Sequence, residues 1–480
     1  MKFPDSKTKI VCTLGPASHD KKIIKELVLA GMNVARLNLA HDKADYHRET
    51  LKNVREVEKE LGVFLPVMMD IPGPKIRIGK IKDGPVLLKK GQKICLTTKN
   101  IVGNESIIPV EYESLFQSIK KGSLVYLYDG FIQLKVKEIQ NNEALCQVVT
   151  GGKLDSHKGL NLPKAKMKID PISEKDLGLI SFGLEEGVTI FGISFVEKAE
   201  DILKVKEFAR KKGQKIFTVA KIEREEAVKN IDEILKVSDA IMVARGDLGV
   251  QVDIEEIPVI QKKLIAKANR MSRPVITATQ MLVSMTENIR PTRSEVTDVA
   301  NAILDGTDAT MLSEETAVGQ FPVEAVKMMT DIAVSTEREY RNFYHKSALC
   351  EDLRLSFQRE KPLVEDIISM HTMESSQIIR SKYVLTPTES GNTARRISRF
   401  KPFCWILAFT PNQKVARFLA LSYGVFPFMI DRKKTDWYKR IMDILREKKL
   451  IKKGDFLILT EGTIKKKTGG TDSMRIIAVD

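Results

Sequence analysis

The chain has 480 residues, a length that favours about three compact domains rather than one. Its composition, 43% hydrophobic and 29% charged, is typical of a soluble globular protein, and no apolar run approaches bilayer length, so we expect no membrane segment. The net charge of +15 suggests nucleic acid as a partner, but only 6% of the residues are aromatic and the lysines are spread out, which favours small phosphorylated substrates instead.

The N-terminus and the cysteines indicate the cellular compartment. Residues 1–15 include basic side chains but lack the apolar core and cleavage site of a secretion signal, so we expect a cytoplasmic protein. The five cysteines are odd in number, scattered and free of CxxC spacing, which argues against disulfides and structural zinc. We expect them to be reduced and mostly buried.

One pattern recurs along most of the chain: a short β-branched apolar run, polar residues, and then an amphipathic stretch of helical period. Such alternation predicts parallel strands joined by helices. Eight strands of this kind close a (β/α)8 barrel of the TIM type, so the predicted fold class is α/β. The candidate strands are residues 9–15, 33–39, 66–71, 188–196, 215–223, 240–248, 274–280 and 309–313.

Two segments depart from the barrel pattern. Residues 73–163 alternate apolar and polar positions between turns, which predicts an all-β lid domain, itself a small β-barrel, inserted after the third strand. In residues 339–480 helices and strands alternate again, which predicts a C-terminal α/β domain. The catalytic barrel would then comprise residues 1–72 and 164–338.

Polar residues collect where the predicted strands end, the face that carries the active site in barrels of this type. Arg36 and Asn38 share one side of the second strand, because alternate residues of a strand point the same way. Lys221 and Glu223 do so at the end of the fifth strand, after an apolar run that would shield them. A lysine and a glutamate in this arrangement could also form a plain ion pair.

A second carboxylate favours catalysis over a plain ion pair. Asp247 follows the sixth strand, and two convergent carboxylates suit an oxygen-ligated cation such as Mg²⁺. Thr279 ends the seventh strand, and the stretch Gly246–Gly249 would offer unobstructed backbone amides to an anion. With the arginine and lysine of the second and fifth strands, these residues predict phosphoryl transfer.

Other chemistries lack their motifs. The six histidines show no HxH or HExxH spacing, and no serine stands in an elbow motif with a His/Asp pair, so zinc hydrolysis and serine catalysis are set aside. The GxGxxG motif after a strand and the P-loop motif GxxxxGK[ST] are also missing.

Runs of sequence over practically the whole chain resemble pyruvate kinase. The resemblance implies a magnesium-dependent glycolytic enzyme, with Mn²⁺ as a substitute metal, that transfers the phosphoryl group of phosphoenolpyruvate to ADP and yields pyruvate and ATP. It also implies an allosteric cytoplasmic homotetramer whose barrel is followed by a regulatory domain. The matching runs are KIVCTLGPAS, MNVARLN, GPKIR, DGFIQL, HKGLNLP, SEKDL, ISFV, AKIE, VARGDLGV, TATQML, RPTRSEVTDVANAILDGTDATMLSEETAVGQFPVEA and SGNTARRISRFKP.

The resemblance implies roles for the residues at the strand ends. Arg36 would hold the transferring phosphoryl group, and Lys221 would neutralise charge on it and on the enolate. Glu223 and Asp247 would hold the divalent metal, and Thr279 would stand in the proton path to the methylene carbon. The substrate carboxylate would be received by Thr279 and the amides of Gly246 and Asp247. The remaining expected contacts are to the substrate, from Ser194 and Phe195, and to ADP, from Asn38, His41, Arg77 and Lys158.

Three residues depart from the family pattern at its potassium site. Many relatives bind K⁺ through oxygens of the asparagine and serine in NFSH and the aspartate and threonine in DTKG. Here Ala40 and Ile71 replace the two hydroxyl residues, and Lys75 replaces a glutamate. We therefore expect K⁺ not to be required, with the Lys75 ammonium in place of the ion and Asp70 as its partner.

The C-terminal segment TESGNT combines hydroxyls and a glycine before a predicted helix, which indicates a phosphate-binding loop. Relatives receive phosphorylated sugars there. Glu389 adds a negative charge, whereas the second loop, residues 462–470, is rich in lysine, and we expect a phosphorylated effector other than fructose 1,6-bisphosphate. The expected effector-loop residues are Thr388, Ser390, Gly391 and Thr393.

Two alternatives come from other classes of protein. A lyase or aldolase on a metal-binding barrel would also hold a pyruvate enolate beside Mg²⁺, but it would have no ADP for Lys158 to bind. A basic nucleic-acid-binding protein would leave the convergent carboxylates unexplained and would be repelled by them.

Overall fold

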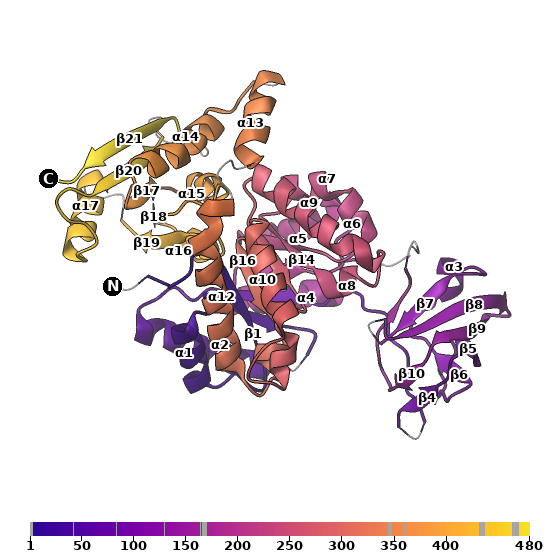
Figure 1. Ribbon diagram of the computed structural model, residues 1–480. Coiled ribbons are helices and arrows are strands. Elements are labelled where there is room, and N and C mark those ends of the chain that lie inside the picture. The colour runs from indigo at the N-terminus through magenta and orange to yellow at the C-terminus, as the bar shows by residue number, and fades with distance from the viewer. Residues whose placement is uncertain are drawn as a thin grey trace.

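The computed structural model describes residues 3–41, 43–82, 84–128, 130–163, 165, 170–343, 348–359, 361–431, 437–462 and 470–480. The chain forms a closed parallel barrel, a β domain that stands to one side of it, and a C-terminal α/β domain at one end (Figure 1). The predicted α/β class, with an inserted β domain, is therefore confirmed. In the described ranges, no helix is both long and apolar enough to pass through a membrane.

Eight parallel strands close the barrel in the order β1-β16-β15-β14-β13-β12-β3-β2. Every strand residue except Asn38 is buried, because side chains fill the barrel and helices cover its outside. All eight predicted strands are present, with shorter bounds. They are β1 (Lys9–Leu14), β2 (Val34–Asn38), β3 (Val67–Ile71), β12 (Ile190–Ile193), β13 (Phe217–Ile222), β14 (Ala240–Ala244), β15 (Val275–Ala278) and β16 (Ala309–Leu312).

The sixth strand is shorter than predicted. It ends at Ala244, and Arg245–Leu248 forms the helical turn α8. The chain leaves the strand direction where the Arg245 guanidinium turns across to the next strand end and donates to the carbonyl oxygen of Thr279. The carboxylate of Asp247 is therefore carried by a helical turn rather than by a strand.

Helices pack their apolar faces against the outer faces of the strands in one continuous core. Two of them begin with capping boxes, at Ser173 and Thr292, which satisfy amides at the helix start. The helices of this part are α1 (Lys21–Ala30), α2 (Ala44–Leu61), α4 (Glu174–Glu185), α5 (Ala199–Lys211), α6 (Glu225–Lys229), α7 (Ile231–Val237), α8, α9 (Ile257–Arg270), α10 (Arg293–Leu304), α11 (Glu314–Ala317) and α12 (Pro322–Phe343), with the 3-10 turns η1 (Ile254–Glu256) and η2 (Val283–Thr286).

The inserted domain follows β3 and has its own apolar core. Its main sheet runs in the order β11-β7-β8-β9-β5-β6, and β10 pairs with β4 beside it. Its elements are β4 (Val86–Leu88), β5 (Lys93–Thr97), β6 (Ile107–Pro109), α3 (Leu115–Ser118), β7 (Leu124–Leu127), β8 (Ile132–Gln140), β9 (Glu143–Thr150), β10 (Gly152–Leu154) and β11 (Leu160–Asn161).

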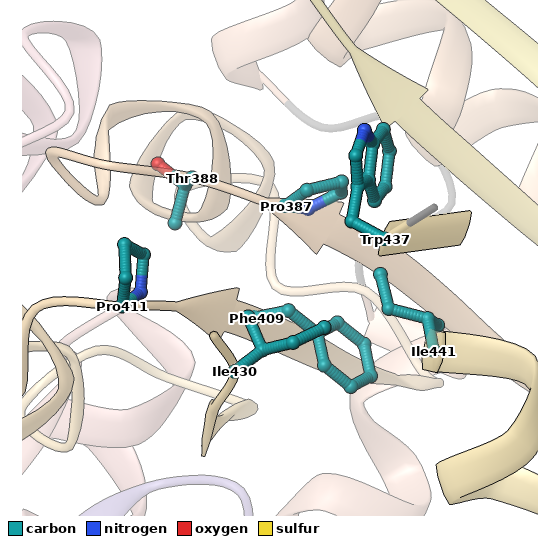
Figure 2. A pocket seen from close by; sticks show the side chains of 7 residues that line it. All are labelled: Pro387, Thr388, Phe409, Pro411, Ile430, Trp437 and Ile441. Carbon is teal, nitrogen blue, oxygen red and sulfur yellow. The ribbon is translucent and has the colours of Figure 1, made fainter. Parts of the chain in front are cut away.

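The C-terminal domain is a five-stranded sheet in the order β19-β18-β17-β20-β21, of which only β21 is antiparallel to its neighbour. A small apolar pocket with about 210 Å³ of empty space lies where β17 and β18 end, beside Thr388 and Trp437 (Figure 2). The elements are α13 (Ala348–Arg359), α14 (Val364–Ile378), β17 (Tyr383–Pro387), α15 (Asn392–Ser398), β18 (Trp405–Thr410), α16 (Gln413–Leu419), β19 (Val425–Met429), α17 (Trp437–Glu447), β20 (Phe456–Glu461) and β21 (Ser473–Ala478).

The C-terminal domain closes the N-terminal end of the barrel. Apolar residues inside the barrel and residues of the C-terminal sheet and helices belong to one buried cluster. The rings of Phe217 in β13 and Phe418 in α16 stack with centroids 4.2 Å apart, and a buried ion pair joins Lys401 to Asp308 at 3.0 Å. The candidate site residues lie at the opposite end of the barrel, where the strands end.

Candidate active site

The ends of β2, β3 and β13 bring buried charges into contact. Arg36 Nε donates to Asp70 Oδ2 at 2.8 Å, and Lys221 Nζ lies 3.2 Å from Asp70 Oδ1. Lys221 Nζ also lies 2.9 Å from Glu223 Oε1 and donates to Ser194 Oγ at 2.8 Å. The structure thus groups four of the expected site residues with Asp70: Arg36, Lys221, Glu223 and Ser194. From the sequence, Asp70 is expected only as a partner for an ion or for Lys75.

Burial and ion pairing act against each other on these groups. Burial would raise the pKa of Asp70, but Lys221 and Arg36 outweigh it and hold that pKa below its usual value. Burial would lower the pKa of Lys221, yet Asp70 and Glu223 hold it above the ordinary lysine range. Lys221 is therefore an ammonium at any working pH, fixed by two carboxylates.

Negative charge is in excess on the side of Glu223. Burial raises the pKa of Glu223, Lys221 lowers it in part, and the nearby Asp247 charge raises it again. The structure describes no cluster of three or more His, Cys, Asp or Glu side chains suited to a metal. Two carboxylates still fit a divalent cation if substrate oxygens and water complete its ligands, which is common for Mg²⁺.

Backbone geometry at β12 holds Glu223 in place. The amide of Phe195 donates to Glu223 Oε2 at 2.8 Å, so both carboxylate oxygens have partners. Phe195 has φ +55°, a left-handed conformation that an L-residue adopts only at a cost of about 1 kcal/mol or more. Gly192 leaves room for this arrangement, since a Cβ there would lie 3.1 Å from Asp70 Oδ1.

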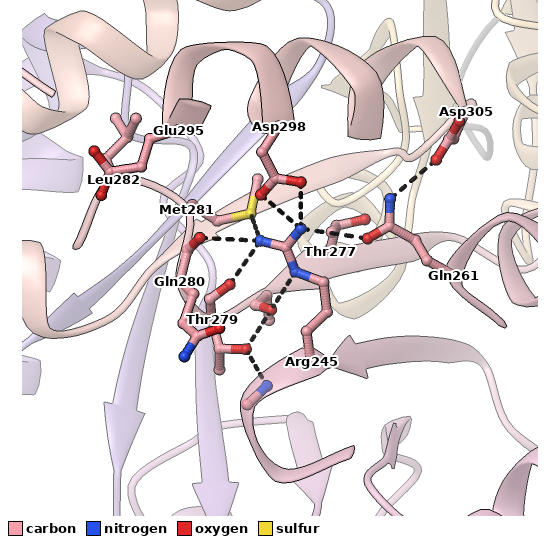
Figure 3. Close-up of polar contacts among 12 residues, drawn as sticks. Arg245, Gln261, Thr277, Thr279, Gln280, Met281, Leu282, Glu295, Asp298 and Asp305 are labelled. Carbon is pink, nitrogen blue, oxygen red and sulfur yellow. Dashed lines mark hydrogen bonds and ion pairs between the residues drawn. The ribbon is translucent and has the colours of Figure 1, made fainter. Parts of the chain in front are cut away.

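The Thr279 hydroxyl is bonded to the Gly246 amide, which is expected to receive the substrate carboxylate (Figure 3). Thr279 Oγ1 accepts the Gly246 amide at 2.7 Å and donates to the carbonyl oxygen of Ala278 at 2.6 Å. The Gly249 amide is bonded to the carbonyl oxygen of Arg245. Of the stretch Gly246–Gly249 that is expected to offer open amides, the two glycine amides are therefore already bonded in this conformation, one to a neighbouring hydroxyl and one to a helical carbonyl.

Arg245 holds the Thr279 segment in position, a role that the sequence analysis missed. Its guanidinium donates to the carbonyl oxygen of Thr279 at 2.7 Å and pairs with Asp298 at 2.7 Å (Figure 3). Thr279 has φ +66° and Gln280 φ +52°, so two successive residues are left-handed. The signal in the sequence is an arginine two residues before the expected metal ligand Asp247.

The residues expected to bind ADP lie on two domains. On the barrel, Asn38 is the last residue of β2 and His41 lies in the loop after it, and Asn38 Oδ1 accepts the Ala40 amide at 3.2 Å. Arg77 and Lys158 belong to the β domain, where Arg77 donates to the carbonyl oxygen of His157 at 2.9 Å. The Lys158 ammonium lies over the Tyr128 ring, 4.4 Å from its centroid.

In the region expected to replace the potassium site, the side chain of residue 71 does not face the site. Ile71 belongs to the hydrophobic core between barrel and helices, on the face of β3 opposite to Asp70. A threonine at this position would turn its hydroxyl into the same core, so the argument from a lost hydroxyl at residue 71 does not hold. Ala40 and Lys75 are exposed, and Asp70 is paired with Arg36 and Lys221.

The expected effector loop is closed by its own hydrogen bonds. Thr388 Oγ1 accepts the Gly391 amide at 2.9 Å, and the Thr393 and Thr471 hydroxyls lie 2.5 Å apart. Ser390 Oγ is 3.5 Å from the Asn392 amide. Residues 463–469 of the lysine-rich second loop lie outside the described residues.

Comparison with known proteins gives one answer along the whole chain. A family model described as "Pyruvate kinase, barrel domain" matches residues 5–326, and one described as "Pyruvate kinase, alpha/beta domain" matches residues 366–477. A pyruvate kinase of Thermococcus litoralis is 48% identical over 479 residues, all of both chains. One of Staphylococcus saprophyticus is 42% identical over 98% of this chain and 80% of its own. A crystal structure of a pyruvate kinase from Cryptosporidium parvum superposes with a TM-score of 0.89 at 35% identity, over 99% of this chain and 96% of that one.

Proposed function

Since the chain belongs to the pyruvate kinase family and has its activity, we propose that Arg36, Lys221 and Thr279 are the residues that carry out the transfer from phosphoenolpyruvate to ADP. The observation that carries this proposal is the buried group in which Asp70 holds Arg36 and Lys221 at the ends of three strands. Two fixed cations with shielded counter-ions form a preorganised site for a group whose negative charge shifts during reaction.

Each cation has a distinct task. Arg36 donates Nε and Nη2 to Asp70 and Nη1 to Thr13 Oγ1. Each Nη nitrogen keeps one further N–H, and these two donors can bind phosphoryl oxygens. Lys221, bonded to Ser194 Oγ, offsets the charge that appears on the enolate oxygen as the phosphorus–oxygen bond breaks. When bound by Glu223 and Asp247, a divalent cation supplies further charge neutralisation at the substrate oxygens.

Thr279 would exchange partners when the substrate binds. A carboxylate that accepts the Gly246 amide displaces Thr279 Oγ1 from it, which frees the hydroxyl for the proton path to the methylene carbon. Asn38, His41, Arg77 and Lys158 would bind ADP together once the β domain closes over the barrel, and closure would exclude water that competes for the phosphoryl group.

The direct test is a coupled assay of pyruvate formed from phosphoenolpyruvate and ADP with magnesium. A lyase or aldolase would leave ADP unconsumed. We also propose a cytoplasmic homotetramer, as the family resemblance implies, which sedimentation of the purified chain would test.

The chain is also proposed to work without potassium. Two residues support this proposal. Ala40 offers no hydroxyl to the ion, and Lys75 supplies a positive charge at the hinge into the β domain, where relatives have glutamate. Lys75 would approach the region of the ion when that domain closes.

Turnover in sodium or tetramethylammonium buffer is therefore expected to lie within about tenfold of turnover in potassium buffer, a difference below about 1.4 kcal/mol of barrier. Lys75→Ala should lose activity without potassium, because nothing else replaces the ion's charge. A larger potassium stimulation of the parent chain would contradict the proposal, and so would full potassium-free activity in Lys75→Ala.

The loop Thr388–Thr393 is proposed to receive a phosphorylated effector other than fructose 1,6-bisphosphate, because Glu389 brings negative charge into it. An effector phosphate would compete for the Gly391 amide that Thr388 Oγ1 now accepts. Activation assays with a panel of sugar and nucleoside phosphates test this, and strong activation by fructose 1,6-bisphosphate would contradict it.

A further inference from the structure

Arginines gather where the N-terminal end of the barrel meets α15, far along the strands from the site described above. Arg273 precedes β15, Arg395 and Arg396 lie in α15, and Arg399 follows it. Arg273, Arg395 and Arg399 border a cavity with about 150 Å³ of empty space, in gaps too narrow for a water molecule. Its lining is Asn269, Ser272, Arg273, Pro274, Asp308, Arg395, Ser398, Arg399 and Ser422.

Several donors in this cavity have no partner. Arg395 is 6% exposed and Arg399 4% exposed, yet Nε and Nη1 of Arg395 and Nε of Arg399 make no hydrogen bond. The hydroxyls of Ser272 and Ser422 are also buried without a partner. Buried polar groups are nearly always paired in folded proteins, so a cluster of unpaired donors calls for an acceptor.

The nearby carboxylates are engaged elsewhere. Asp308 pairs with Lys401 at 3.0 Å, Asp239 pairs with Lys206 at 2.7 Å, and Asp366 is shared by Arg396 and Arg399. Among the described residues this leaves Arg395 without a carboxylate partner.

Electrostatics in the cavity oppose the charge that Arg395 carries. Burial, together with the positive charge of the neighbouring Arg273, lowers the pKa of Arg395 to about 10. Burial likewise lowers the pKa of Arg273 and of Arg399. The cavity is thus a concentration of buried positive charge that a bound anion would relieve.

We propose that this cavity binds a phosphate-type oxyanion, either free or as the phosphate group of a small metabolite. A tetrahedral oxyanion offers several acceptors at once, which match the guanidinium edges of Arg395 and Arg399 and the Ser272 and Ser422 hydroxyls. The arginine side chains must rotate to admit it, and Arg273 is the half-buried member of the group, so its rotation would open the cavity toward solvent.

The position links the cavity to both other sites. Ser272 and Arg273 lead into β15, which ends one residue before Thr279, and Arg395 lies in α15, which begins at Asn392 within the 388–393 loop. Occupancy would join the barrel to α15 through one ligand and stabilise the junction of the two domains.

The test uses the full chain and inorganic phosphate, added at constant ionic strength with chloride as the reference. Phosphate binding is measured by titration calorimetry, and the unfolding temperature is recorded in parallel. Arg395→Gln should weaken one phosphate-binding event at least tenfold, whereas Arg395→Lys, which keeps charge but not the planar fork, should restore it in part. Arg36→Gln and Thr388→Val remove phosphate binding at the other two sites and should leave this event intact.

The same titrations are repeated with a nucleoside monophosphate and with a sugar monophosphate. Of the three ligands, the one whose affinity depends most on Arg395 identifies the source of the phosphate. If Arg395→Gln does not fold, Ser422→Ala with Ser272→Ala provides the same comparison. Unchanged phosphate binding in these variants would overturn the proposal. So would phosphate binding that disappears entirely in Arg36→Gln or Thr388→Val, because the measured binding event would then belong to one of those two sites.

Discussion

Replacing Lys221 with methionine is expected to reduce turnover at least a thousandfold, about 4 kcal/mol of barrier, while phosphoenolpyruvate binding changes by less than about tenfold. The reason is that the Lys221 charge matters most when negative charge moves onto the enolate oxygen in the transition state. Arg36 remains on Asp70 at 2.8 Å and can still hold the phosphoryl group of the bound substrate. The measurement is turnover in the coupled assay beside equilibrium binding of phosphoenolpyruvate.

The Lys221 variant also loses stability, and the control must separate the two effects. Without the ammonium, Asp70 keeps only Arg36 and Glu223 loses its counter-ion, and breaking a buried pair of this kind costs about 3–5 kcal/mol. Turnover is therefore measured well below the unfolding temperature of the variant. Lys204→Met, which removes a 2.6 Å ion pair with Asp170 on the outside of the barrel, should leave turnover unchanged. Near-normal turnover in folded Lys221→Met would remove Lys221 from the mechanism.

Glu223→Gln and Asp247→Asn are each expected to raise the magnesium concentration for half-maximal activity by about a hundredfold, or about 2.7 kcal/mol. Both substitutions keep the shape of the side chain and remove one negative charge. In Glu223→Gln the lysine contact at 2.9 Å becomes an ordinary hydrogen bond, whereas in Asp247→Asn the ion pairs around Asp70 stay as they are. Activity is titrated against magnesium at saturating substrate.

Glu314→Gln is the matched control, because Glu314 is an exposed carboxylate that follows β16 at the same end of the barrel. Its magnesium dependence should equal that of the parent chain. If Glu223→Gln and Asp247→Asn also retain the parent dependence, the metal binds elsewhere.

The fold class and the candidate catalytic and metal-binding residues can be predicted from the amino-acid sequence. Each strand appeared as a short apolar run followed by an amphipathic helix, and because a parallel barrel buries both strand faces, local pattern and global architecture agree. Lys221, Glu223, Asp247 and Thr279 can be identified from the sequence because polar residues at the carboxyl ends of buried strands, or in the turns after them, must lie at one end of such a barrel.

Tertiary structure alone decided which of these residues are partners. Periodicity tells which face a side chain occupies, but not which distant group meets its charge. Asp70 therefore emerged as the common partner of Arg36 and Lys221, and the Gly246 amide was found bonded to Thr279.

The arginine cavity also depends on contacts between distant residues that sequence periodicity does not predict. Arg273 and Arg395 are more than a hundred residues apart in the printed sequence and come together only because the C-terminal domain closes the base of the barrel. In the sequence each is one basic residue among many that could be solvated. The burial of Arg395 distinguishes it from a surface arginine, because an unpaired guanidinium costs little free energy in water and much more in a cavity that excludes water.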